Sequence, residues 1–214
     1  MRHRLLCSTV FVIVAFAGIA SAQSPQWRYG GRVSWVNAGT SSDELGDTGS
    51  TLDLRSGLGV EFDATLMFSD LFGVEFSVGV SAHPVETSGG ELGAIDVGRL
   101  TLIPLTAIGQ YHHPVYGPWD PYVGLGVTWA APFFRTSQEA TDAGVEKIEL
   151  EGGPAIAAQI GVNYQMDNRW YANFDLRYFG TSLDVQVRTE EGNLPTITLD
   201  AKPLTVSLGF GYKF

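Results

Sequence analysis

Apolar and polar residues alternate along most of this chain. In residues 204–214 every second residue, from Leu204 to Phe214, is apolar, and Thr, Ser, Gly and Lys fill the positions between them. Alternation with a period of two places the two sets on opposite faces of a β-strand. The same pattern is clear in residues 73–82, 122–131, 155–166 and 170–179. Each of these segments is about ten residues long or longer, the length that a tilted strand needs to cross a bilayer.

Three more segments alternate less cleanly, namely residues 27–37, 52–67 and 99–112. The last is apolar on both faces for much of its length, and we assign its outward side to Ile103, Leu105, Ala107 and Tyr111. With these three, eight strands are predicted. After Ile19 no stretch approaches a transmembrane helix. Because only helices and closed barrels satisfy the backbone inside lipid, the pattern predicts an all-β fold, an eight-stranded antiparallel transmembrane β-barrel.

The predicted connections alternate in length along the chain. Four are long, at residues 38–51, 84–97, 134–152 and 188–200. The three between them are shorter, at residues 69–71, 113–120 and 167–168. Long extracellular loops at one end and short turns at the other are typical of bacterial outer-membrane barrels, and this pattern places both chain ends with the short turns. Fourteen of the 23 Asp and Glu residues lie in the long loops, so the acidity belongs mainly to that rim.

Aromatic residues gather near both ends of the predicted strands, where interfacial girdles would lie. At the short-turn end they are Tyr29, Phe68, Phe72, Tyr111, Tyr122, Tyr164, Trp170 and Phe214. At the long-loop end they are Trp35, Trp129, Phe133 and Tyr178. In the third long loop, residues 137–145, we expect a short helical turn with Ser137 as its N-cap. That turn either covers the mouth of the barrel or is disordered.

The N-terminus has the layout of a secretory signal peptide. Residues 1–4 are basic, residues 5–19 are almost wholly apolar, and residues 20–22 are the small-residue tripeptide Ala-Ser-Ala. We therefore expect a cleaved signal peptide at residues 1–22 and an outer-membrane barrel at residues 23–214. The alternative is a retained anchor, but an apolar run of about fifteen residues is shorter than the roughly 20 that span a bilayer.

Composition argues against several classes of function. Cys7 is the only cysteine and would leave with the signal peptide, so we expect no disulfides and no thiol chemistry. The chain carries a net charge of −10, and the loss of Arg2 and Arg4 makes it −12. This balance argues against nucleic acid as a partner and against docking on anionic lipid through basic residues.

A soluble secreted barrel of the lipocalin kind would show the same alternation with the apolar face turned inward. Here the opposite face carries Arg28, Arg32, Arg55, Glu61, Asp63, Glu75, Asp175 and Arg177. These charges cannot form a dry core without a large desolvation cost, whereas in a lumen they can pair with one another. A transmembrane barrel, with the charged face in its lumen, therefore explains the sequence better than a soluble barrel does.

Three segments resemble the OmpW family of outer-membrane proteins, which includes the AlkL-type alkane importers. They are DPYVGLGVTW (residues 120–129), GVNYQMDNRWYANFDLRYF (161–179) and LGFGYKF (208–214). The resemblance covers about half of the chain, from Pro104 onward, and rests on strand motifs. It implies an eight-stranded barrel in the bacterial outer membrane that passes small hydrophobic compounds through a narrow lumen with lateral exit into lipid. Phe214 resembles the C-terminal aromatic residue by which the barrel-assembly machinery recognises such proteins.

An eight-stranded barrel is only just wide enough for its own side chains, so free passage of water-soluble nutrients is not expected. The predicted lumen-lining residues are Leu102, Ile108, Phe179, Arg28, Arg32, Glu61, Glu75, Asp175 and Arg177. The charges near Glu61, Glu75 and Arg177 are expected to block a straight route. A small apolar solute would then leave sideways at Pro104 or Pro154, because proline removes a hydrogen bond from the ladder. The expected partners are outer-membrane lipid, lipopolysaccharide and such a solute.

No catalytic residues, cofactor or metal site are predicted. Ser81 and His83 share one face, as in barrel enzymes that modify lipid A, but no third residue is assignable to orient the histidine. His112 and His113 point to opposite faces and cannot jointly bind a metal. The acidic loops could gather Ca²⁺ or Mg²⁺ against lipopolysaccharide phosphates, although solubility of the rim explains them more simply. The alternative function is a structural or adhesive barrel with a closed lumen and the acidic loops as its working surface.

Overall fold

The computed structural model describes residues 25–38, 40–42, 51–89, 95–142, 145–189, 192–193 and 197–214. The expected signal peptide, residues 1–22, lies outside the described residues. No helix in the described part of the chain is both long enough and apolar enough to span a bilayer.

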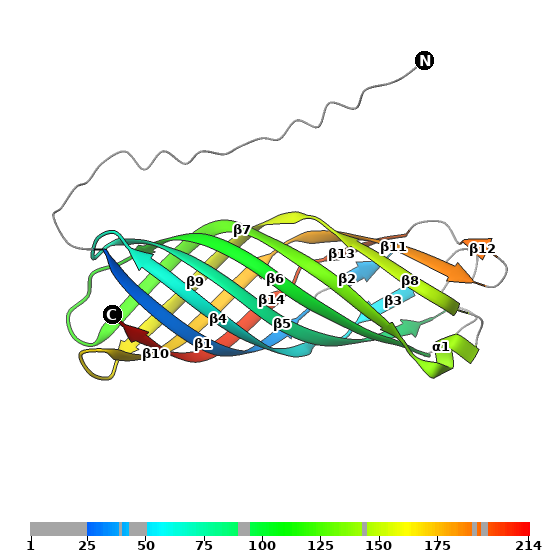
Figure 1. The fold of residues 1–214 in the computed structure, drawn as a ribbon, viewed down its shortest axis with the longest axis horizontal. Helices are drawn as coiled ribbons and strands as arrows, with labels where there is room; N and C mark the ends of the chain where they lie inside the picture. Colours follow the sequence, from blue (N-terminus) through cyan, green and yellow to red (C-terminus); the bar gives the residue numbers. More distant parts are fainter. Residues whose placement is uncertain are drawn as a thin grey trace, which may run out of the picture.

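Within the described residues, eight antiparallel strands close into a barrel (Figure 1). They are β1 (Gln26–Asn37), β4 (Gly57–Met67), β5 (Phe72–Ser88), β6 (Asp96–His112), β7 (Trp119–Thr136), β9 (Pro154–Gln165), β10 (Trp170–Phe179) and β14 (Leu204–Lys213). Each strand pairs with its neighbour along the chain, and β5 pairs with β6. The ring closes where β1 meets β14, with Val33 opposite Leu208. The predicted fold class and the closure of the first strand against the last are confirmed.

The strands continue past the barrel at the end opposite the C-terminus (Figure 1). Six short strands prolong this end. β2 (Thr40–Ser42), β8 (Val145–Gly152), β12 (Gly192–Asn193) and nearly all of β13 (Ile197–Ala201) lie in regions predicted as long loops, whereas β3 (Thr51–Leu54) lies mostly in a segment predicted as strand and β11 (Thr181–Thr189) mostly precedes the fourth predicted loop. In the second sheet β8, β11, β13 and β2 pair in the same order as β9, β10, β14 and β1 in the barrel, so the barrel wall is prolonged.

The sequence-based prediction therefore made several strands too short at the long-loop end. Pro84 was taken as the start of a loop, yet it lies inside β5 and pairs with Arg99. The β5–β6 register shifts just after it, between Val85 and Glu86, and strand prolines are tolerated at such irregularities. The carbonyl of Pro84 accepts a hydrogen bond from the N–H of Arg55 at 2.9 Å. The predicted helical turn exists as α1 (Gln138–Asp142), and the carbonyl of Ser137 accepts a hydrogen bond from the N–H of Thr141.

The two faces of the strands differ as the alternation predicts. Leu208 in the middle of β14 is 64% exposed on the outer surface, whereas Asp175 on β10 is fully buried inside. On β6 the outward side carries Leu105 and Tyr111, and Ile108 is buried. The outward assignment made for residues 99–112 is thus correct. The outer surface is a band of large apolar side chains, as lipid requires.

Aromatic rings gather at the short-turn end, where Trp27, Tyr29, Tyr212 and Phe214 form ring contacts across the β1–β14 seam. Trp119 with Tyr164 continues this girdle on the opposite wall. Tyr122 does not belong to it. Its ring is buried in the lumen and its hydroxyl donates to Asp175, because Tyr122 falls on the inward face of β7.

The outward apolar band can be tested with an arginine at its centre. We expect Leu208→Arg to destabilise the barrel by about 2–4 kcal/mol, the cost of a cation near the bilayer midplane. Tyr116→Arg is the control, because Tyr116 is fully exposed in the turn before β7 and should change stability by no more than about 0.5 kcal/mol. Denaturant unfolding in phospholipid vesicles measures both. Equal stability of the two variants would contradict a lipid-facing Leu208.

Candidate functional site

All nine of the predicted lumen-lining residues are buried inside the barrel. They are Leu102, Ile108, Phe179, Arg28, Arg32, Glu61, Glu75, Asp175 and Arg177. The structure brings five of the charged members together in the middle of the lumen and places Arg28 near the short-turn end. The three apolar members lie in two separate apolar clusters.

The centre of the lumen holds an ionic network built from β1, β4, β5 and β10. Arg32 on β1 donates to Glu75 and lies 3.0 Å from Asp63 and 3.3 Å from Glu61. Arg177 on β10 donates to Glu61 at 2.6 Å and to Glu75 at 2.8 Å. Asp175 on β10 lies 3.5 Å from Arg32, so the two guanidinium groups are shared among carboxylates from three strands. Glu61, Glu75 and Arg177, whose charges were expected to block a straight route, meet here, and Arg32 is the second centre of the network.

Neutral side chains complete this network. Gln110 on β6 and Gln159 on β9 donate amide hydrogens to Glu75, and Tyr122 donates to Asp175 at 2.8 Å. Buried charges are tolerable only when paired and hydrogen-bonded, and here partners come from strands all around the ring. Sequence analysis missed Gln110, Gln159 and Tyr122. Their inward position on the strands was the available signal, whereas their contacts depend on register.

The network leaves little space in the lumen. Beside Arg32, Glu75 and Tyr122 the remaining cavity is about 10 Å³, which is room for about one water molecule. On β7 the glycines at 124 and 126 face Ile108 so closely that a Cβ at Gly124 would lie 2.5 Å from its side chain. The middle of the barrel is therefore filled, as expected for eight strands.

Toward the short-turn end the lumen stays polar. Arg28 donates to Asp120 at 2.8 Å, and the Nδ1 of His112 lies 2.7 Å from the same carboxylate.

In the turn between β9 and β10, the carboxylate of Asp167 accepts the N–H groups of Arg169 and Trp170. These hydrogen bonds lower the pKa of Asp167, because they stabilise its charged form. His112 is buried and His113 exposed, so the two histidines point to opposite faces, as predicted.

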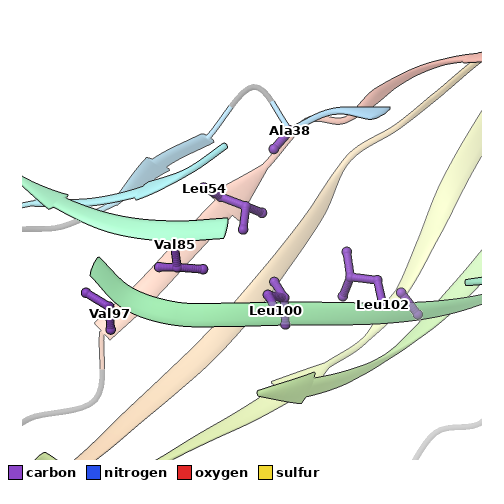
Figure 2. Packing of buried hydrophobic residues seen from close by; sticks show 7 residues of the cluster. Ala38, Leu54, Val85, Val97, Leu100 and Leu102 are labelled. Atoms are coloured by element: carbon purple, nitrogen blue, oxygen red, sulfur yellow. The ribbon is translucent and has the colours of Figure 1, made fainter. Parts of the chain in front are cut away.

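Toward the long-loop end most of the buried lumen side chains are apolar, and His83 and Ser81 are polar exceptions. Figure 2 shows the first apolar cluster, formed by Ala38, Leu54, Val85, Val97, Leu100, Leu102 and Ala130. A second cluster, nearer the ionic network, joins Ile108 and Phe179 with Ala155 and Ala157. The lumen thus changes from apolar to ionic along its length.

A cavity of about 40 Å³ lies where the apolar part meets the ionic network. Leu102, Ala130 and Phe179 line it on the apolar side, and Glu61 and Arg177 line it on the ionic side. The lining also includes Val60 and Val80, whose side chains belong to the lipid-facing surface. The cavity therefore reaches into the wall of the barrel.

The β5–β6 ladder lacks two pairs beside this cavity, and it resumes beyond them in the same register. The β5–β6 ladder pairs Val78 with Leu105 and then Ser81 with Leu102, and it skips Gly79 and Val80 between them. Pro104 stands opposite this gap and has no N–H to donate. Gly79 adds no side chain, and a Cβ there would lie 3.5 Å from the Cγ of Pro104.

The second candidate for lateral exit has a different setting. Pro154 is the first residue of β9 and pairs with Trp129 at the end of the β7–β9 ladder. Its missing N–H therefore removes nothing from the interior of a ladder. The structure sets the two prolines apart, since the missing ladder pairs lie beside Pro104.

Ser81 and His83 are hydrogen-bonded inside the barrel. The Nε2 of His83 lies 3.0 Å from the Oγ of Ser81, and the backbone carbonyl of Arg55 lies 3.1 Å from its Nδ1. The carbonyl is the orienting partner that sequence analysis could not assign, because a backbone group gives no signal in the residue type. Ser81 lines the cavity beside Pro104, whereas His83 is fully buried behind it.

Comparison with known proteins gives one family. The OmpW family model matches residues 32–214. Outer membrane protein AlkL of Ectopseudomonas oleovorans is 31% identical over 157 residues, 72% of this chain and 64% of that protein. The dibenzothiophene metabolism operon protein PahQ of Pseudomonas aeruginosa is 24% identical over the full length of both chains.

The fold also matches solved barrels. The crystal structure of the outer membrane protein OprG from Pseudomonas aeruginosa superposes with a TM-score of 0.80 at 22% identity, covering 89% of this chain and 96% of that one. The described ring of eight strands and the match over residues 32–214 agree with the resemblance carried by the strand motifs. The chain belongs to the OmpW family of bacterial outer-membrane β-barrel proteins.

Proposed function

We propose that this protein is a channel for passive passage of small hydrophobic molecules across the outer membrane. The observation that carries the proposal is the change along the lumen, from the apolar clusters at the loop end to the ionic network in the middle. The missing β5–β6 ladder pairs lie where the two meet. An apolar solute that enters from outside would follow the apolar part and turn aside at the network.

The ionic network makes a straight route unfavourable. To pass it, a solute would have to separate Arg32 or Arg177 from its carboxylates, and breaking a buried ion pair costs about 3–5 kcal/mol. An apolar molecule offers these charges no hydrogen bonds in return. A solute that leaves sideways before it reaches the network avoids this cost.

The gap beside Pro104 is the lateral exit in this proposal. Neither Gly79 nor Val80 pairs with β6, and Pro104 has no N–H to donate, so fewer hydrogen bonds hold β5 and β6 together there than along the rest of the ladder. Lipid lies directly outside, since Val80 is exposed on the outer surface. The name of PahQ ties one relative to the metabolism of an apolar aromatic compound, which supports this class of solute.

Uptake measurements test the proposal. We expect octane to enter asymmetric vesicles with lipopolysaccharide in the outer leaflet several-fold faster when they contain the protein, because the channel bypasses that leaflet. An enclosed alkane-binding reporter protein measures arrival. Pro104→Val restores an N–H at the gap and should lower the rate, whereas the matched control Pro154→Val should not. Uptake equal to that of protein-free vesicles would contradict transport and favour the closed structural or adhesive barrel.

We also propose that Phe214 is the assembly signal. The terminal residue is 76% exposed, and its ring meets Tyr29 and Tyr212 at the seam where β1 closes on β14. A ring displayed at the barrel end is available to the assembly machinery.

Deleting Phe214 should reduce the amount of folded protein in the outer membrane, and Phe214→Tyr should preserve it. The folded barrel is counted by its altered electrophoretic mobility in unheated samples. Refolding of the deletion variant in vesicles without the machinery separates recognition from stability. Normal assembly in cells without Phe214 would overturn its role as a signal.

A further inference from the structure

The cavity beside Pro104 carries hydroxyl groups among its apolar side chains. Ser34, Ser81, Thr106 and Thr205 line it together with Leu102, Ala130 and Phe179. An alkane needs no hydroxyl contacts, so their hydrogen-bonding state decides which other solutes the cavity favours. Two of them, Ser81 and Thr106, have neighbours that fix where their hydrogens point.

The direction of the Ser81 hydrogen bond follows from the backbone of Arg55. Its carbonyl oxygen can only accept, so the Nδ1 of His83, at 3.1 Å, carries the ring proton. His83 is fully buried and its two nitrogens meet a carbonyl and a hydroxyl, so no carboxylate compensates a charge and the neutral ring is favoured. Nε2 is then an acceptor, and Ser81 must donate its hydrogen to it across 3.0 Å. The Ser81 oxygen is left with lone pairs only.

The hydroxyl of Thr106 also donates its hydrogen to a neighbouring residue. The hydroxyl of Thr128 donates to the carbonyl of Leu105 at 3.3 Å, so its own hydrogen is used. The Oγ1 of Thr106 lies 2.8 Å from that of Thr128 and therefore donates to it. The oxygen of Thr106 is thus also an acceptor. On the ionic side, Glu61 adds a carboxylate, which in its charged form accepts only.

Arg177 also lines the cavity, but its Nη1 and Nη2 already donate to Glu61 and Glu75. The hydroxyls of Ser81 and Thr106 therefore add hydrogen-bond acceptors to the lining. We propose that the site prefers solutes with an O–H or N–H donor on an apolar body, that is, small alcohols and phenols, with Ser81 as the contact and His83 as its positioning residue. This inference rests on the proposed function and narrows its solute class. With a volume of about 40 Å³ the cavity accommodates the polar head, while the apolar body extends along Leu102, Ala130 and Phe179.

Matched solutes test the preference. Hexan-1-ol and hexan-2-one are similar in size, but only the alcohol donates a hydrogen bond. In the vesicle assay, with an enclosed reporter for each solute, we expect protein-dependent uptake of the alcohol to exceed that of the ketone by about fivefold, the worth of one hydrogen bond. Ser81→Ala should bring the ratio close to one, and Ser81→Thr should restore it. Thr65→Val is the control, since Thr65 is a buried lumen residue that does not line this cavity.

Nitrogen NMR of His83 gives a second readout that does not depend on transport. We expect the neutral ring with its proton on Nδ1, and a shift of the Nε2 resonance when hexan-1-ol is added but not when hexan-2-one is added. A proton on Nε2, or equal shifts with both solutes, would overturn the inference.

The outcomes separate the two proposals. If the ketone enters as fast as the alcohol or faster, or if Ser81→Ala keeps the wild-type ratio, the donor preference is wrong and transport stands. If neither solute enters above the protein-free background, the proposed function fails, and the NMR titration on the purified protein still decides whether Ser81 binds alcohols.

Discussion

The whole structure depends on one constraint, which is that every backbone N–H and C=O inside lipid needs a partner from the protein itself. The β1–β14 ladder meets it, because it joins the first strand to the last and leaves the ring without an open edge. Closure with only eight strands then sets a narrow lumen, and the inward side chains must fill it. The ionic network fills the middle of this lumen, and the apolar clusters fill its long-loop end.

The ionic network divides the lumen into two chemically different parts. Arg32 and Arg177 are shared among Glu61, Asp63, Glu75 and Asp175, so each charged side chain has a partner of opposite charge. Separating any of them from its partners would leave a buried charge unpaired, which costs free energy. The part beyond them, toward the long loops, is apolar and reaches the wall at Gly79 and Pro104. Since a proline inside a ladder weakens it, the position of Pro104 beside the cavity supports the lateral route that we propose.

Sequence alone was sufficient for the strands, their faces and the ring, because lipid on one side and a polar lumen on the other enforce alternation. It failed at the strand ends beyond the bilayer, where no lipid imposes that pattern, so Pro84 was mistaken for a loop residue. The nine lumen candidates lie inside for the same reason that the alternation was readable. Their contacts were out of reach, since the pairing of Arg177 with Glu61 spans distant strands and depends on register.

In the function that we propose, apolar solutes leave through the wall beside Pro104. A disulfide across the gap tests it most directly, using Gly79→Cys with Pro104→Cys in a Cys7→Ser background, because a Cβ at Gly79 lies 3.5 Å from the ring of Pro104. We expect oxidation to abolish the protein-dependent octane uptake that the reduced double variant shows, and a reductant to restore it, while the oxidant leaves the uptake of each single-cysteine variant unchanged. Uptake that continues unchanged through the oxidised, cross-linked barrel would contradict the account.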